Sequence, residues 1–107
     1  MARQPGGQEL RAFVLEILAR REAYGYEVAN ELRGIDEDLD VAEGSVYPAL
    51  RRLERDGLAS SHWVDVGAEV PRRRYYVLTP KGQAVLARMR PVRQAAPAGR
   101  KFGEVRP

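Results

Sequence analysis

Arginine side chains gather in two short stretches of this sequence, and their chemistry is that of phosphate binding. A guanidinium group donates several hydrogen bonds in a fixed fork that matches phosphate oxygens. Basic groups on a helix beside basic groups on a strand suit a polyanion that presents both a groove and a backbone, so we expect double-stranded DNA as the partner. The arginines are Arg51, Arg52 and Arg55 in the first stretch and Arg72, Arg73 and Arg74 in the second.

The start of the first stretch offers further groups to a phosphate. Ser45 and Tyr47 supply a short and a long hydroxyl donor near a predicted helix start, where free backbone N–H groups favour an anion. Gly44 permits close approach of a ligand. Pro48 lies inside the predicted helix, where proline costs about 3 kcal/mol, and we interpret it as setting a bend or a late start. These four residues join the six arginines as expected DNA-binding residues.

The two basic stretches are open to different alternatives. A basic outer face on a helix is often only a solvated face, which is the alternative for the first stretch. In the second stretch, alternation along a strand lets at most two of three consecutive side chains point the same way. Arg72 and Arg73 are therefore favoured for contacts with the DNA backbone or the minor groove.

Hydrophobic periodicity predicts the helices that must position these groups. Residues 8–21 carry the apolar stripe of an amphipathic helix, and a shorter helix opens at residues 24–26. We expect Gly34 to end the second helix in the left-handed conformation. A third helix should start near residues 42–43, present the first basic stretch on its outer face, and end at Gly57.

A β-hairpin is predicted after the third helix. Residues 58–66 and 73–78 are rich in strand-forming types and flank a turn at residues 67–71. Two strands alone are not stable, so the hairpin must lie against the helices. The fold class is therefore mainly α with a β-hairpin, in the α+β class.

The C-terminal part is expected to contain one further helix and a tail. Thr79 is a capping residue and Pro80 suits the first turn of a helix, which Pro91 should end or kink. Beyond this point the sequence loses periodicity and gains proline, glycine and charge. We expect one domain of residues 8–90 and a basic, disordered tail of residues 91–107.

Composition argues against several classes of function. The chain has no cysteine and a single histidine, His62, so we expect no metal site and no cofactor. No oriented base accompanies the serines, which argues against an enzyme. No apolar run marks a signal peptide, and we expect a cytoplasmic protein that does not bind membranes. The single tryptophan, Trp63, either packs the hairpin or lines a pocket for a small effector.

Three helices followed by a hairpin is the order of the winged helix-turn-helix, here with an additional C-terminal helix. Four motifs in this order resemble the phenolic acid decarboxylase repressor (PadR) family. They are YGY at 24–26, GSVYPAL at 44–50, LERDGL at 53–58 and RRYYVLTPKG at 73–82. The resemblance covers roughly residues 10–89. It implies a bacterial transcriptional regulator, usually a dimeric repressor that a small apolar or aromatic ligand releases from its operator.

The chain departs from the family pattern in its C-terminal part. Members end in a large helical dimerisation domain or in one longer helix, whereas here the last helix meets Pro91 early. The contact with a second subunit is then expected on small and apolar side chains, and the first-helix members of this set can equally belong to a broad core face. The expected contact residues are Ala12, Leu15, Ala19, Ala84 and Ala87. Alternatively, the basic tail orders on DNA or on the partner.

The acidic residues between Asp36 and Asp40 lie close in sequence to the third helix and would repel phosphate unless they turn away. A symmetric dimer would place two third helices about 34 to 36 Å apart, on a pseudo-palindromic operator. The alternative function is a ligand-sensing or protein-interaction module that has the winged-helix shape but no specific DNA binding. A further alternative is a protein that coats nucleic acid without site preference.

Overall fold

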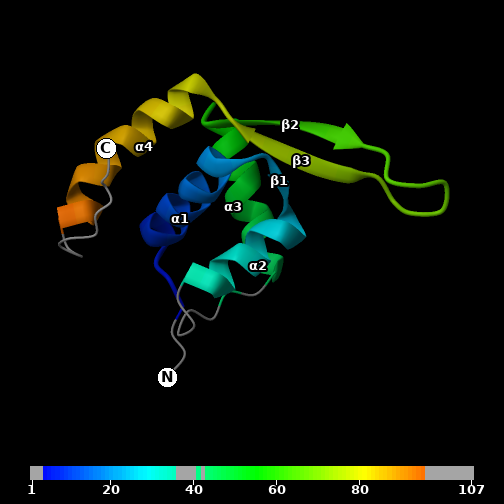
Figure 1. The fold of residues 1–107 in the computed structure, drawn as a ribbon, viewed down its shortest axis with the longest axis horizontal. Coiled ribbons are helices and arrows are strands. Elements are labelled where there is room, and N and C mark those ends of the chain that lie inside the picture. The colour runs from blue at the N-terminus through cyan, green and yellow to red at the C-terminus, as the bar shows by residue number, and fades with distance from the viewer. Residues whose placement is uncertain (1–3, 36–40, 42, 96–107) are drawn as a thin grey trace.

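The computed structural model describes residues 4–35, 41 and 43–95. Within them, four helices and a three-stranded antiparallel sheet form a winged helix-turn-helix (Figure 1), as the sequence predicts. The elements are α1 (Gly7–Arg20), β1 (Ala23–Tyr24), α2 (Gly25–Ile35), α3 (Glu43–Arg55), β2 (Ala59–Val64), β3 (Arg73–Leu78) and α4 (Pro80–Ala95). None of the described helices is both long and apolar enough to cross a membrane.

Helix α1 is the element around which the core is built. Val14, Leu15 and Ile17 have no exposed surface, and α1 packs against α2, α3, α4 and β3. The expectation that Leu15 and Ala12 contact a second subunit is therefore wrong, because both side chains are buried in the protomer itself. The apolar side of α1 is a broad core face, which was the alternative.

Helix α3 begins and ends where the sequence predicts. Gly57 follows its last turn with φ +80°, a left-handed conformation that glycine adopts at little cost. The N–H of Leu58 donates to the carbonyl of Leu53 over 2.9 Å, and the N–H of Gly57 donates to that of Glu54 over 3.0 Å. This pair of hydrogen bonds is the Schellman motif that closes a helix and turns the chain into β2.

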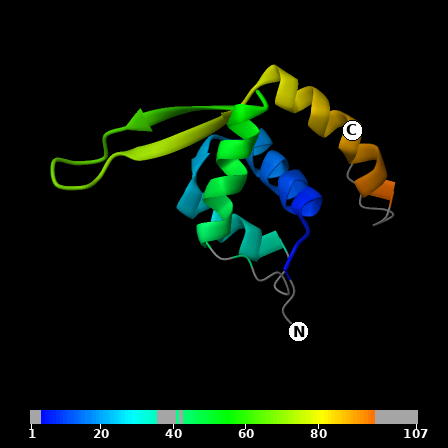
Figure 2. The same ribbon diagram turned by 180° about the vertical axis from the view of Figure 1, so that it is seen from behind.

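The β2–β3 hairpin is the predicted wing, and it extends away from the helices in both views (Figures 1 and 2). Its register pairs Ala59 with Leu78 at the base and Val64 with Arg73 further out. A third strand, β1, pairs with β3 and gives the order β1-β3-β2. Two residues are too short a strand to produce a period, so the sequence did not predict β1.

Glycine does not end α2. Gly34 lies inside the helix, which continues to Ile35, and the described glycines with positive φ angles are Gly57 and Gly67. The predicted left-handed stop at Gly34 is therefore wrong. A glycine inside a helix costs only about 1 kcal/mol relative to alanine, which is too little to end a helix that buries an apolar face.

Helix α4 starts at the predicted cap but does not end at the predicted proline. The Thr79 hydroxyl accepts from the N–H of Gly82 over 3.0 Å and donates to the carbonyl of Gly57 over 2.7 Å. The helix then runs through Pro91 to Ala95, so the expectation that Pro91 ends it is wrong, whereas a kink at Pro91 stays a prediction. Proline removes one helical hydrogen bond, and the turns on either side can continue despite that loss. The expected disordered tail from residue 96 on lies outside the described residues.

Replacing Gly34 by alanine is expected to stabilise the protein by about 0.5–1 kcal/mol, because the residue is helical and an added Cβ meets no atom. Chemical denaturation of the wild type and Gly34→Ala measures this change. As the contrasting variant, Gly82→Ala should cost about 1–3 kcal/mol, since its Cβ would collide with the Leu58 carbonyl and the Leu78 side chain. A loss of stability in Gly34→Ala would contradict the helical assignment.

Candidate nucleic-acid interface

The outer face of α3 presents the residues that the sequence selects for DNA contact. Val46, Leu50 and Leu53 are buried and set the inner face of the helix. The side chains opposite to them are exposed, as predicted from the spacing. The exposed set consists of Gly44, Ser45, Tyr47, Pro48, Arg51, Arg52 and Arg55.

Pro48 lies in the middle of α3 and does not delay its start. The helix begins at Glu43, five residues earlier, so the interpretation of a late start is wrong. A bend at Pro48 stays a prediction. The residue gives the outer face an apolar surface between Tyr47 and the arginines.

The Tyr47 ring packs against the start of α2. A Cβ on Gly25 would fall within the ring, so only a glycine permits this contact. The ring keeps 38% of its surface exposed and is thus fixed on one side and accessible on the other. Sequence reasoning missed the role of Gly25, although the glycine lies in the YGY motif.

The three arginines of the wing have different surroundings. The guanidinium of Arg72 lies 5.2 Å from the centre of the Trp63 ring, and that of Arg73 lies 4.6 Å from the centre of the Tyr24 ring. Cation–π contacts of this kind leave the guanidinium N–H groups free to donate elsewhere. Arg74 is instead held by hydrogen bonds within the protein. The expectation that the three do not share one orientation agrees with these contacts.

A closed ring of hydrogen bonds joins α3 to the wing. Arg74 donates from Nε to the hydroxyl of Ser61 over 2.9 Å and from Nη2 to Oε1 of Glu54 over 3.2 Å. The Ser61 hydroxyl donates to the other Glu54 oxygen over 2.7 Å. Glu54 belongs to the last turn of α3, Ser61 to β2 and Arg74 to β3. The ring therefore fixes the base of the wing relative to α3.

The arginines of α3 and the wing differ in whether they form an ion pair with a described acidic residue. Across the described ranges, no ion pair involves Arg51, Arg52, Arg72 or Arg73. Arg55 makes only a loose pair with Asp56, with 3.8 Å between Nε and Oδ1. The charge of Arg52 contributes to lowering the pKa of Asp56, whereas the charges of Arg51, Arg72 and Arg73 are matched by no ion pair within the described chain. The acidic stretch at residues 36–40 lies outside the described residues.

A cleft of about 440 Å³ opens between α3 and the wing. Tyr47 and Arg51 line it from α3, and Trp63, Arg72 and Arg73 line it from the wing. Trp63 is 53% exposed, so the expectation that it packs the wing core is wrong. Its predicted place in an effector pocket stays a prediction. Core packing at the base of the sheet comes instead from Tyr76.

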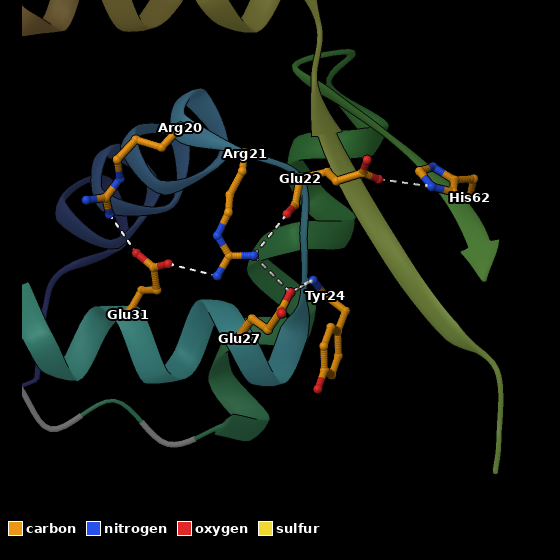
Figure 3. A network of polar contacts seen from close by, with 7 residues as sticks. All are labelled: Arg20, Arg21, Glu22, Tyr24, Glu27, Glu31 and His62. Atoms are coloured by element: carbon orange, nitrogen blue, oxygen red, sulfur yellow. Dashed lines mark hydrogen bonds and ion pairs between the residues drawn. The ribbon is translucent and has the colours of Figure 1, made fainter. Parts of the chain in front are cut away.

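A second polar network holds the connection between α1 and α2 in place (Figure 3). Arg21 donates to Glu31 over 3.0 Å, and its pKa is raised chiefly by that hydrogen bond and by the charge of Glu27. The Glu27 carboxylate accepts from the N–H of Tyr24 over 3.3 Å and thereby caps α2. His62 Nε2 lies 3.0 Å from a Glu22 oxygen, which links β2 to this connection. We therefore assign His62 a structural role.

The end of α3 is also tied to α1. Arg11 donates to the Asp56 carboxylate over 3.1 Å, and this hydrogen bond lowers the pKa of Asp56. Nearby, Lys81 donates to the backbone carbonyl of Asp56 over 3.1 Å. Two contacts from α1 and α4 therefore fix the turn that carries the chain from α3 into the wing. No group of three side chains able to hold a metal ion is found among the described residues.

Comparison with known proteins identifies the family of this chain. A family model described as the transcriptional regulator PadR-like family matches residues 14–88. The chain belongs to the PadR-like family. Its members are DNA-binding transcription regulators, as the resemblance implies. Among individually curated proteins, none matches this PadR-like chain.

Solved structures of similar sequence share the fold. A PadR family transcription regulator from Clostridium difficile is 32% identical, with 77% of this chain and 83% of that chain covered and a TM-score of 0.68. A PadR-like transcription factor from Bacteroides fragilis is 32% identical, with coverage of 80% and 81% and a TM-score of 0.72. A PadR-like transcriptional regulator from Bacillus cereus is 31% identical, with coverage of 78% and 79% and a TM-score of 0.66.

The Arg11–Asp56 pair of this PadR-like chain predicts a pH-dependent stability. Because the pKa of Asp56 is lowered on folding, the pair stabilises the protein above the unfolded pKa of the carboxyl and stops doing so as the pH falls through the folded pKa. Arg11→Met should lower the melting temperature at neutral pH and have little effect in strong acid. Thermal unfolding at both pH values measures the difference. An equal loss at both would mean that Arg11 acts by packing.

Proposed function

We propose that this chain is a dimeric, cytoplasmic repressor that binds a pseudo-palindromic operator and is released by a small apolar or aromatic effector. The observation that carries DNA binding is the set of arginines on α3 and the wing that form no ion pair with any residue that the structure describes. Membership of the PadR-like family supplies the role in transcription. Repression and the effector are supported by the family resemblance of the sequence motifs.

The geometry suits a major groove flanked by two phosphate backbones. Helix α3 has a continuous exposed face from Ser45 to Arg55, and this face would enter the groove. Ser45 and Tyr47 offer hydroxyls in its first half, and Arg51 and Arg52 follow one turn later. The wing extends to one side, where Arg72 and Arg73 would reach the flanking backbone.

The proposed dimer contact lies on α1 and α4. Ala19, Ala84 and Ala87 are exposed there, and small side chains allow two helices to approach closely. Partly buried apolar side chains of the same two helices border them and would gain burial in a dimer. These are Leu10, Phe13, Val85 and Met89. Helix α4 lies on the side of the molecule opposite to the hairpin tip, so a contact along α4 leaves the wing accessible (Figure 2).

Charge reversal on two of the cleft arginines that form no ion pair within the described residues tests DNA binding. Arg51→Glu and Arg72→Glu should each weaken operator binding at least about tenfold, because a phosphate contact is replaced by repulsion. Arg33→Glu makes the same change in charge on the exposed surface of α2, outside the cleft and outside the proposed dimer contact, and should bind as the wild type does. Fluorescence anisotropy of labelled DNA from the promoter of the chain's own locus, at near-physiological salt, measures each affinity.

Competitor DNA separates the proposed function from its alternatives. Wild-type binding that survives excess nonspecific competitor supports a site-specific regulator. Binding that the competitor abolishes indicates a protein that coats nucleic acid, and no binding at all indicates a ligand-sensing or protein-interaction module. Equal affinities of the three charge variants would contradict the assigned interface.

The dimer contact is tested by one bulky charge. Ala84→Arg should shift the chain from dimer to monomer, because a long cation cannot be desolvated between two closely packed helices. Sedimentation velocity over a range of concentrations measures the oligomeric state. Affinity for the full operator should fall while affinity for a half-site stays unchanged. A dimer that persists in Ala84→Arg would place the contact elsewhere.

A further inference from the structure

We propose that the cleft between α3 and the wing holds the sugar–phosphate backbone of duplex DNA and that Trp63 is one of its contact residues. This inference rests on the proposed DNA binding and adds to it a residue and a part of the DNA. The sequence had assigned Trp63 to core packing or to an effector pocket.

The exposure of Trp63 is the first observation that needs explaining. An indole ring is the largest apolar group of any side chain, and its burial would stabilise the fold. Nevertheless, 53% of the surface of Trp63 is exposed to solvent. The guanidinium groups of Arg72 and Arg74 lie over the ring as cation–π contacts, 5.2 Å and 5.5 Å from its centre. The part of the indole that these groups leave exposed is thus an apolar surface next to two cations. A deoxyribose joined to a phosphate has the matching pattern of an apolar ring beside a negative charge.

The second observation is the charge on both sides of the cleft. Arg51 approaches from α3, and Arg72 and Arg73 approach from the wing. None of the three forms an ion pair in the part of the chain that the structure describes. The volume of about 440 Å³ lies within the range of about 300–1,000 Å³ that holds small-molecule-sized groups. A strand that leaves the major groove would pass between these cations.

The third observation assigns Arg74 a positioning role. Its guanidinium is held by Ser61 and Glu54 at the base of the wing, and Trp63 stands directly across the strands from it. Arg74 therefore supports one side of the indole while its charge is matched by Glu54. Of the three consecutive arginines, Arg72 and Arg73 keep their charge for phosphate and Arg74 orients the tryptophan.

Because Trp63 is the only tryptophan, its fluorescence reports this contact in the unmodified protein. Quenching by acrylamide should be strong in the free protein and at least about threefold weaker when the protein is saturated with a mixed-sequence duplex at low salt, since backbone contacts do not depend on base sequence. Anisotropy of the labelled duplex in the same samples establishes saturation. Unchanged quenching in a saturated complex would overturn the proposal.

Variants supply the energetic test. Trp63→Ala should weaken binding to operator and nonspecific DNA by about the same factor of ten, because the apolar surface that the indole would bury against the sugar is lost. Trp63→Phe should recover most of this loss. His62→Ala is the matched control, because His62 is half exposed on the same strand but contacts Tyr75 and Glu22 on the other face. It should bind as the wild type does.

The salt dependence separates direct contact from a general disturbance of the wing. Trp63→Ala removes no charge, so the slope of log affinity against log salt should stay at the wild-type value, whereas Arg72→Ala should reduce it by about one. Wild-type affinity in Trp63→Ala, or an altered slope, would overturn the proposal. If the wild-type protein binds no duplex in the anisotropy assay, the proposed function itself fails, which is a distinct outcome.

Discussion

The Glu54 carboxylate is the group on which the candidate interface depends. One of its oxygens accepts from Arg74 on β3 and the other from Ser61 on β2, while Glu54 itself belongs to α3. Three elements thus meet in one ring of hydrogen bonds, next to the buried Tyr76 of the core. A two-stranded hairpin has little stability of its own, so its direction must come from such contacts at its base. The angle between α3 and the wing follows from this ring and from the core beneath it.

Glu54, together with Asp56, also determines which arginines form ion pairs within the described residues. It neutralises Arg74, and Asp56 is paired with Arg11, whereas Arg51 and Arg72 form no ion pair in the described ranges. A formal net charge of +3 would not single out any surface, but the distribution of partners does. The uncompensated charge lies along one path from the outer face of α3, across the cleft, to the wing.

Much of this fold could be predicted from the sequence, because its strongest signals are local. The period of α3 and the glycine at position 57 gave both the outer face and the end of the helix. The short strand β1 and the burial of Leu15 depend on contacts between distant segments, which periodicity does not record. For the site, the residue types were predictable, but the pairing of Arg74 and the exposure of Trp63 were not. Both depend on the register of β2 against β3.

The most direct test of this account is a map of amide chemical-shift changes, recorded by NMR as the operator duplex is added to the labelled protein. The account predicts that the largest changes fall on the exposed residues of α3 between Ser45 and Arg55 and on the wing from Trp63 to Arg73, with small changes along the exposed face of α4. Changes centred on α1 and α4, with α3 and the wing unaffected, would contradict it.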